Sequence, residues 1–292
     1  MGLLTKKILK ITITIAPKEQ ILEEIKKYLA KSKIESQKLK VSNIKPLIIF
    51  TPNPEIINFA QKDSNFKQIV NSAQINIPDG WGVSWGIRKL SGLSVKKLSG
   101  TDFMLELCQL AVNKGARVGL IGGRGGVALA TSECLREKYP GLKIRVFETP
   151  ENEIQISKFK KAIKEPEERY FESLAKTIKE KKIDILFVAL GCPKQEYFIE
   201  KVKFQMSRPK ADRPLDENVK YDRPLVLMAV GGAFDYISGR VPRAPVWMRE
   251  RGLEWLYRLM REPWRLERQM RGAEFFWKVI NCQDDAKRQL QT

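Results

Sequence analysis

Short apolar runs alternate with longer segments of helical periodicity along most of the chain. The runs are rich in β-branched residues and lie at 11–15, 46–50, 75–77, 118–121, 142–147, 183–190 and 225–230. Between them, apolar residues recur at helical spacing, as at Ile21, Ile25 and Leu29. The last two runs are apolar throughout at 185–190 and 225–230, which is typical of strands buried on both faces. The pattern predicts an α/β protein whose mostly parallel sheet carries helices on both faces.

The character of the chain changes at residue 240. From there on, arginines are interleaved with the aromatic residues Trp247, Trp255, Tyr257, Trp264, Phe275, Phe276 and Trp277. Trp and Tyr suit a boundary between water and an apolar phase, and Arg binds phosphate groups. We therefore expect a core domain at 1–239 and a helical appendage at 240–292 that contacts an anionic membrane or the substrate. The alternative is a helical pair that packs its aromatic side chains on the core.

Composition narrows the chemistry. The 292 residues include 53 Lys and Arg against 34 Asp and Glu, a net charge of +19, which favours polyanions or an anionic membrane surface as partners. A basic surface that serves only solubility is the alternative. The chain contains no histidine, so mechanisms that use Ser-His-Asp or Cys-His and metal sites with His ligands are excluded. A general base must be Asp, Glu, Lys, Tyr or Cys.

The cysteines and the apolar segments bear on location. Cys108, Cys134, Cys192 and Cys282 show no C-x-x-C spacing, so no zinc or redox motif is visible, and we expect reduced thiols in the cytoplasm. No apolar run approaches the roughly 20 residues of a membrane-spanning helix, and residues 1–17 lack the features of a signal peptide.

Polar residues directly follow several predicted strands. Thr51 and Asn53 come after the run at 46–50, where they can hydrogen-bond a sugar or base, or cap a helix. Asp79 follows the run at 75–77, where a carboxylate can act as a general base or as an ordinary turn residue. Because ligands bind at the carboxyl ends of parallel strands, we expect these side chains to share one site.

A glycine-rich turn follows the run at 118–121. It begins with Gly122 and Gly123, and residues 123–128 fit the G-x-G-x-x-A spacing of dinucleotide-binding proteins. Glu148 lies about 20 residues further on, where such proteins carry a ribose-binding acid. This turn indicates a nucleotide, and it supports an alternative function as an NAD-dependent oxidoreductase.

Two further turns follow the two most apolar runs. Lys194 and Gln195 can hold phosphate or sugar hydroxyls, and Gly231 and Gly232, just before Asp235, permit close approach of a ligand. Ordinary connecting turns are the alternative for both. Together with the turns above, they predict a single ligand site at one edge of the sheet.

Six motifs occur in a fixed order along the chain. They are T-P-N-P-E at 51–55, I-P-D-G-W-G at 77–82, S-G-T-D at 99–102, G-C-P-K-Q-E at 191–196, G-G-A-F-D at 231–235, and R-A-P-V-W-M with G-L-E-W-L-Y-R-L-M-R-E-P-W-R at 243–265. Each motif alone is weak, but the ordered set is specific. Over about residues 46–268 the chain resembles the WecG/TagA/CpsF glycosyltransferases (family 26).

The resemblance implies a Rossmann-like fold and an inverting transfer that needs neither a metal ion nor a cofactor. The donor would be a UDP-sugar, carrying N-acetylmannosamine, its uronic acid or glucose. The acceptor would be a polyprenyl-diphosphate-linked sugar in the synthesis of a cell-surface polysaccharide. The enzyme would be cytoplasmic and peripheral on the inner face of the cell membrane. Relatives also suggest homo-oligomers that form through surfaces that the appendage would otherwise cover.

The resemblance also implies roles for individual residues. Asp79 matches the general base, Thr51 and Asn53 match substrate-contacting positions, and Gln195 matches a sugar-contacting position. Three arginines of the appendage match ones thought to close over the site: Arg258, Arg265 and Arg268. Lys97 stands where relatives often carry arginine, and Asp102 belongs to the S-G-T-D motif. The His-His-Gly segment common in the family after the run at 142–147 is missing.

Two alternatives lie outside this family. An NAD-dependent oxidoreductase would use the turn at 122–128, but no catalytic His or Tyr-Lys pair stands at a recognisable spacing. A basic protein that binds nucleic acid would show tight, salt-sensitive binding to any duplex. That hypothesis gives no reason for the motifs to fall at strand ends, so we expect no nucleic-acid partner.

Overall fold

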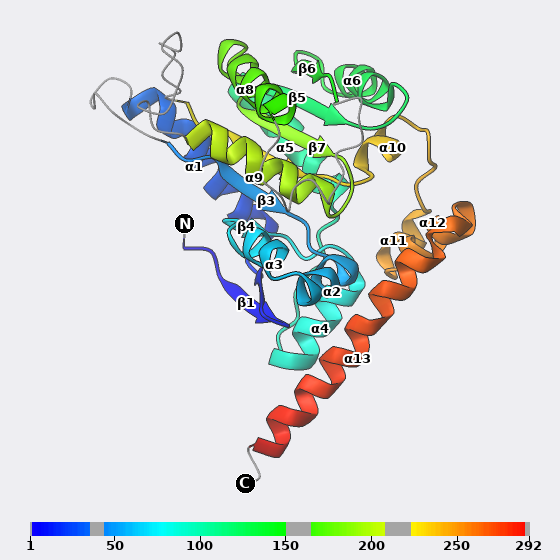
Figure 1. Ribbon diagram of the computed structural model, residues 1–292. Helices are drawn as coiled ribbons and strands as arrows, with labels where there is room; N and C mark the ends of the chain where they lie inside the picture. The colour runs from blue at the N-terminus through cyan, green and yellow to red at the C-terminus, as the bar shows by residue number, and fades with distance from the viewer. Residues whose placement is uncertain (1, 36–43, 150–164, 208–222, 290–292) are drawn as a thin grey trace.

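The computed structural model describes residues 2–35, 44–149, 165–207 and 223–289 (Figure 1). Its centre is a six-stranded sheet in the order β4-β3-β8-β7-β5-β6, with all five ladders parallel. The strands are β3 (Leu47–Phe50), β4 (Ile75–Asn76), β5 (Arg117–Gly122), β6 (Lys143–Phe147), β7 (Ile185–Ala189) and β8 (Val226–Ala229). The predicted α/β fold with a parallel sheet is confirmed.

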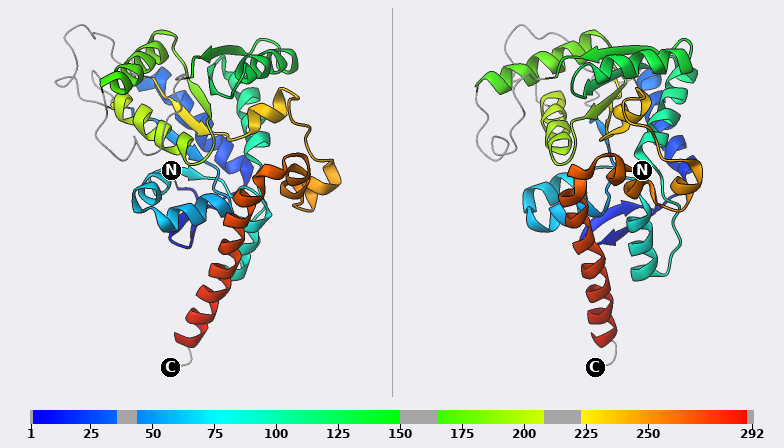
Figure 2. Two further views of the ribbon diagram at one scale, coloured as in Figure 1. Left: turned by 45° about the vertical axis from the view of Figure 1, so that its right-hand side comes forward. Right: turned by 90° about the vertical axis from the view of Figure 1, so that its right-hand side faces the viewer.

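Helices cover both faces of the sheet (Figure 2). One face carries α2 (Pro54–Lys62), α3 (Ser64–Asn71), α8 (Glu165–Glu180) and α9 (Lys194–Ser207). The other carries α1 (Lys18–Glu35), α5 (Gly100–Lys114), α6 (Val127–Lys138) and α10 (Ala233–Ile237). Side chains of a strand point alternately to the two faces, so Ile48 and Phe50 join one core cluster and Leu47 and Ile49 the other.

An N-terminal hairpin forms a second, two-stranded sheet. The predicted strand at 11–15 is confirmed as β2 (Ile11–Thr14), but it pairs antiparallel with β1 (Thr5–Ile8), which the sequence pattern did not predict. Leu9 and Lys10 connect the two strands with φ values of 45° and 65°, the positive values that a tight two-residue hairpin turn needs. The hairpin packs against α4 (Trp81–Ser91).

The C-terminal appendage is helical, as predicted. It consists of α11 (Val246–Glu250), α12 (Glu254–Arg261), the 3-10 helix η2 (Pro263–Arg265) and α13 (Leu266–Gln289). The long helix α13 packs across α2 and α4 and then projects past them (Figure 1). Phe275 and Val279 of α13 are fully buried in the same cluster as Phe50, so the appendage shares its core with the sheet domain.

Three predicted boundaries differ from the structure or leave its described part. Helix α1 continues to residue 35, whereas the sequence pattern ended it at 29 and predicted a loop at 32–45. Residues 36–43 of that loop lie outside the described residues. Of the helical segment predicted at 152–182, α8 is described and 150–164 are not; the predicted loop at 204–224 begins after α9, and 208–222 lie outside.

Candidate active site

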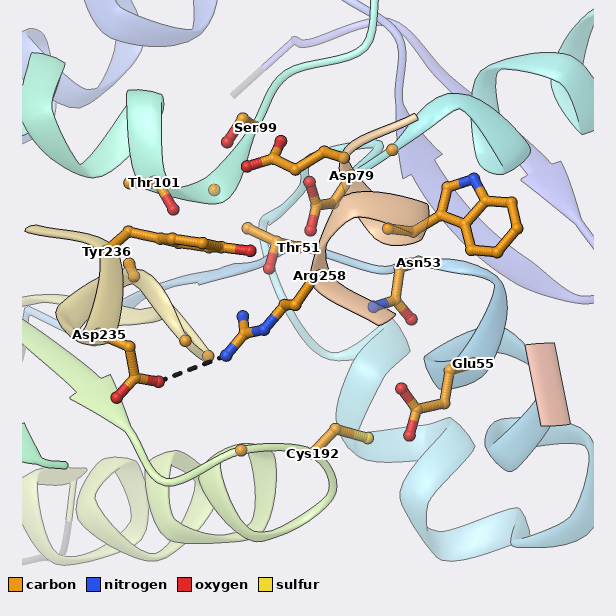
Figure 3. Close-up of a pocket in the computed structure, with 18 of the residues that line it drawn as sticks. Thr51, Asn53, Glu55, Asp79, Ser99, Thr101, Cys192, Asp235, Tyr236 and Arg258 are labelled. Atoms are coloured by element: carbon orange, nitrogen blue, oxygen red, sulfur yellow. Dashed lines mark hydrogen bonds and ion pairs between the residues drawn. The ribbon is translucent and has the colours of Figure 1, made fainter. Parts of the chain in front are cut away.

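The carboxyl ends of the strands open into a cavity of about 1380 Å³. Each of five strands is followed, within three positions, by a residue that lines the cavity: Thr51 after β3, Asp79 after β4, Gly123 after β5, Gly191 after β7 and Gly231 after β8. Figure 3 shows Thr51 and Asp79 on one side of this cavity and Asp235 on the other. The sheet therefore brings together turns that are up to 180 residues apart in the sequence (51 to 231).

Most of the predicted site residues line this cavity. Those that do are Thr51, Asn53, Asp79, Lys97, Asp102, Gly123, Lys194, Gln195, Gly231, Gly232, Asp235 and Arg258. Gly122 does not line it. The backbones of Arg265 and Arg268 lie in η2 and α13, but their side chains are outside the described part of the structure.

Asp79 is held at the inner wall of the cavity. Its backbone N–H donates to the Pro52 carbonyl at 3.0 Å, and its carboxylate accepts from the Gly100 backbone N–H. Burial is the main reason that the pKa of Asp79 is raised to about 7. The negative charges of Glu254 and, to a smaller extent, Asp102 also raise this pKa. The Gly100 N–H and the Arg243 guanidinium act in the opposite direction. A carboxylate with this pKa can accept a proton efficiently near neutral pH.

Thr51 and Asn53 lie beside Asp79 on the loop after β3 (Figure 3). The Asn53 side chain caps α2, because its Oδ1 accepts from the Ile56 N–H at 2.9 Å. Thr51 is 6% exposed and packs closely against Gly100. A Cβ added to Gly100 would lie 3.2 Å from Thr51 Cγ2. The helix-cap alternative is thus correct for Asn53, whose position on the cavity wall is compatible with both roles.

Gln195 joins the ends of two strands. Its Oε1 accepts from the Gly231 N–H at 3.0 Å, and its Nε2 donates to Glu196 Oε1 at 3.0 Å. Gln195 is only 2% exposed, and the turn before it contains a cis peptide bond between Cys192 and Pro193. In this structure Gln195 fixes the distance between the β7 and β8 turns at the cavity wall.

Packing alone requires a glycine at position 122. Its φ is +105°, and an added Cβ would lie 2.5 Å from the Ala189 carbonyl oxygen of β7. Its N–H donates to Thr149 Oγ1 at 3.1 Å. The glycine-rich turn reaches the cavity through its next residues, Gly123, Arg124 and Gly125.

Arg258 reaches the cavity from α12 of the appendage. Its guanidinium lies 3.4 Å from Asp235, 2.6 Å from Glu262, and 4.8 Å from the centre of the Tyr236 ring. An added Cβ on Gly232 would lie 2.4 Å from Arg258 Nη1, so this glycine makes room for the arginine. Figure 3 shows Arg258 extending toward the turn after β8. A cation is thus held at the strand ends opposite Asp79.

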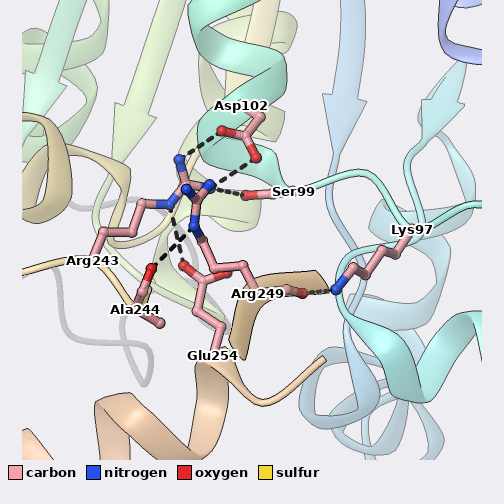
Figure 4. Close-up of polar contacts among 7 residues, drawn as sticks. All are labelled: Lys97, Ser99, Asp102, Arg243, Ala244, Arg249 and Glu254. Atoms are coloured by element: carbon pink, nitrogen blue, oxygen red, sulfur yellow. Dashed lines mark hydrogen bonds and ion pairs between the residues drawn. The ribbon is translucent and has the colours of Figure 1, made fainter. Parts of the chain in front are cut away.

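Lys97 and Asp102 bind residues of the appendage (Figure 4). Lys97 Nζ donates to the backbone carbonyls of Arg249 and Glu250. Asp102 accepts two hydrogen bonds from the Arg243 guanidinium, at 2.6 and 2.8 Å. Both side chains line the cavity, but in this structure they hold the segment that covers it.

Sequence reasoning did not single out Glu254, Arg243 or Tyr236, which also line the cavity. Glu254 and Arg243 lie within the motif at 243–265. Nothing in the sequence distinguishes Arg243 from the other arginines of this motif, or marks Glu254 as a residue that contacts the site. In the described residues, no three Cys, Asp or Glu side chains are grouped as a metal ion would require. Nor is any described helix long and apolar enough to cross a membrane.

The fold and the cavity define an α/β enzyme whose ligand site lies at the carboxyl ends of a parallel sheet. The chain belongs to the glycosyl transferase WecG/TagA/CpsF family, whose model matches residues 7–289. It is therefore a glycosyltransferase, and the resemblance inferred from the motifs is confirmed. This membership favours sugar transfer over the alternative of an NAD-dependent oxidoreductase.

Curated relatives of known name are similar over most of the chain. A protein of Bacillus subtilis (strain 168) is 30% identical over 240 residues, which cover 82% of this chain and 81% of the relative. A protein of Staphylococcus aureus (strain MW2) is 26% identical over 269 residues, which cover 92% and 89%. Both are named N-acetylglucosaminyldiphosphoundecaprenol N-acetyl-beta-D-mannosaminyltransferase.

Proposed function

We propose that this glycosyltransferase moves an N-acetylmannosamine-type sugar from a UDP-sugar to N-acetylglucosamine linked to a polyprenyl diphosphate. The observation that carries the proposal is the Asp79 carboxylate, which has a pKa near neutrality. It lies in a cavity lined by arginines of the appendage. The names of the two relatives support the acceptor and the transferred sugar. Some members of the family transfer glucose, which is the second candidate sugar.

The reaction is a single displacement that inverts the anomeric carbon. Asp79 removes the proton from the acceptor hydroxyl while that oxygen bonds to C1 of the donor sugar. The bond from C1 to the diphosphate oxygen breaks, and its electron pair leaves with UDP. Arg258 stabilises the growing negative charge on the diphosphate, the role that a metal ion plays in other transferases. Arg265 and Arg268 are proposed to assist it.

The remaining predicted residues are proposed to bind the two substrates. Thr51 and Asn53 lie next to Asp79 and are placed to hold the acceptor or the transferred sugar. Lys194 lies at the N-terminus of α9 and lines the same cavity as Gly123, Gly231 and Gly232. Backbone N–H groups and a lysine at such turns suit a diphosphate.

The rim of the cavity suits a lipid-linked acceptor. Trp81, Trp255, Trp264, Leu266 and Met270 line the cavity and are also exposed large apolar side chains. Trp264 and Met270 are 74% and 65% exposed. Apolar and aromatic side chains beside many arginines favour contact with an anionic membrane surface. We therefore propose that the enzyme acts as a peripheral protein on the inner face of the cell membrane. Formation of homo-oligomers is a separate prediction.

The test is a transfer assay with a panel of donors. The enzyme is incubated with a polyprenyl-diphosphate-linked N-acetylglucosamine and with UDP-N-acetylmannosamine, UDP-N-acetylglucosamine or UDP-glucose, with and without a chelator. We expect a lipid-linked disaccharide from UDP-N-acetylmannosamine, of inverted anomeric configuration, whether or not the chelator is present. Product from UDP-glucose alone would select the second candidate, and no product from any UDP-sugar would overturn the proposal.

Binding gives an independent check on the donor. A ligand at about 100 times its dissociation constant adds about 2.7 kcal/mol to the free energy of unfolding, which a thermal melt detects. We expect UDP to raise the melting temperature and NAD to leave it unchanged. Stabilisation by NAD alone would favour the oxidoreductase.

A further inference from the structure

Arg243 connects the sheet domain, the appendage and the surroundings of Asp79. Its two terminal nitrogens hydrogen-bond Asp102 on the first turn of α5, and one of them also donates to Ser99 Oγ at 3.2 Å. Its Nε donates to Glu254 Oε1, at the start of α12, at 3.3 Å. The side chain is 20% exposed, and its planar fork matches a carboxylate in a way that the lysine ammonium does not (Figure 4).

The residues that Arg243 binds enclose Asp79 from both sides. Ser99 and Asp102 flank Gly100, whose N–H donates to the Asp79 carboxylate. On the appendage side, Glu254 is the charged group that affects Asp79 most strongly. The other charged side chains of the described residues that line this cavity are Lys97, Arg249, Arg258, Asp235, Glu262, Glu55, Arg124, Lys194 and Arg240. A single guanidinium therefore joins the core helix that supports the carboxylate to the appendage helix that covers it.

Helix α12 needs such a connection because it has no buried residue of its own. The loop before α12 packs against Trp81 at Gly252. A Cβ added to Gly252 would lie 2.6 Å from Trp81 Cβ, so this close contact requires a glycine. Lys97 holds the end of α11 through backbone carbonyls. These contacts position the loop, whereas the Arg243–Glu254 pair acts on α12 at the residue next to Asp79.

We propose that Arg243 is a positioning residue that clamps α12 onto α5 and so keeps the appendage closed over Asp79. This inference rests on the proposed function, in which Asp79 is the general base. When α12 is seated, Asp79 is desolvated and faces the Glu254 carboxylate. When α12 moves away, water and the loss of Glu254 return Asp79 to an ordinary, weakly basic carboxylate. The base is thus strong only while the site is closed over its substrates.

The sign of one pH shift tests the clamp. The acidic limb of the kcat–pH profile for transfer is measured in the full-length wild type and in Arg243→Met and Arg243→Lys. If Arg243 seats α12, both variants lower kcat by about tenfold or more, and their acidic limb moves to lower pH by roughly one unit. If Arg243 acted only as a nearby cation, Arg243→Met would move the limb to higher pH and Arg243→Lys would leave it unchanged, and either result would overturn the proposal.

Two companions complete the experiment. Glu254→Gln removes the appendage carboxylate without disturbing the Arg243–Asp102 pair, and its acidic limb should also move to lower pH. Arg251→Met removes an arginine of the same segment that stacks 5.5 Å from the Trp247 ring, and it should retain the wild-type profile. Asp79→Asn separates the two proposals: wild-type transfer in that variant overturns the base itself. If Asp79→Asn is inactive while Arg243→Met keeps the wild-type kcat and limb, only the clamp fails.

Discussion

The sheet domain and the helix that covers the cavity are stabilised by different contacts. All five residues of β7 are buried, and the cores on both sides of the sheet are apolar. In α12 no residue is buried, and its contacts with the core include the Arg258–Asp235 ion pair and the contact of Arg258 with the Tyr236 ring. Partly exposed ion pairs are weak and exchange readily with water, whereas apolar burial does not. The difference indicates that α12 can leave the cavity while the sheet domain stays folded.

Helix α13 resembles the core rather than α12. It buries Phe275 and Val279 against α2 and α4, and Phe276 stacks on Trp81. The appendage therefore has an anchored part and a part held by polar contacts. We expect substitutions in the first to change stability and substitutions in the second to change turnover.

The largest expected effect on stability is at the anchor. Phe275→Ala removes a fully buried ring from the shared core and should lower the free energy of unfolding by about 3–5 kcal/mol. Chemical denaturation measures this. Trp277→Ala is the matched control on the same helix, because Trp277 is 66% exposed, and it should change stability by no more than about 0.5 kcal/mol. Equal losses in the two variants would mean that α13 is not anchored as described.

The next effect is on turnover through α12. Arg258→Met should lower kcat for transfer by about 10²–10³, because the departing diphosphate loses a charged donor in the site. The fold should persist, as judged by circular dichroism. Arg261→Met, an exposed arginine that lies over the Tyr257 ring on the same helix, should keep wild-type turnover. Comparable losses in both would show that the charge of the helix, and not the position of Arg258, matters.

A smaller effect concerns the stability cost of the base. Because the folded-state pKa of Asp79 is raised from 3.8 to about 7, the folded protein holds that proton more tightly than the unfolded chain. The contribution of Asp79 is therefore most favourable below about pH 4 and is lost as the pH rises through 7. Asp79→Asn should raise the free energy of unfolding at pH 8 by up to about 4 kcal/mol and have little effect at pH 4. Destabilisation at pH 8 would argue that the carboxylate is well solvated.

The smallest effect is expected at the rim. Trp264→Ser combined with Met270→Ser removes exposed apolar side chains, so binding to vesicles that contain anionic lipid should weaken by roughly tenfold. Sedimentation with the vesicles measures the bound fraction. Leu129→Ser is the control, because Leu129 is an exposed apolar side chain on α6 of the sheet domain, and it should leave binding unchanged. Unchanged binding in the rim variant would place the membrane contact elsewhere.

The sequence predicted the half of the site that the sheet builds. Strand patterns place Thr51 and Asp79 after β3 and β4, and a parallel sheet must bring such positions to one edge. Gly122 was predicted as part of a ligand turn, but its lack of a side chain serves the approach of Ala189. That approach depends on which strands are neighbours, and the order of strands is not contained in the local pattern.

The covering half could not be predicted from local patterns. Arg243 pairs with Asp102 across 141 residues, and Lys97 reaches the Arg249 carbonyl across 152. These partners depend on how α11 and α12 fold back over the sheet. The motifs therefore identified the participating segments, while the pairing of charges within them required the three-dimensional arrangement.

The central claim is that Asp79 is the general base of a sugar transfer. The most direct test measures UDP binding and sugar transfer to the polyprenyl-diphosphate-linked acceptor on the same preparation of Asp79→Asn. The account predicts that the variant binds UDP as the wild type does and forms no more than about one thousandth of the wild-type product per unit time. Transfer within tenfold of the wild-type rate, with UDP bound, would contradict it.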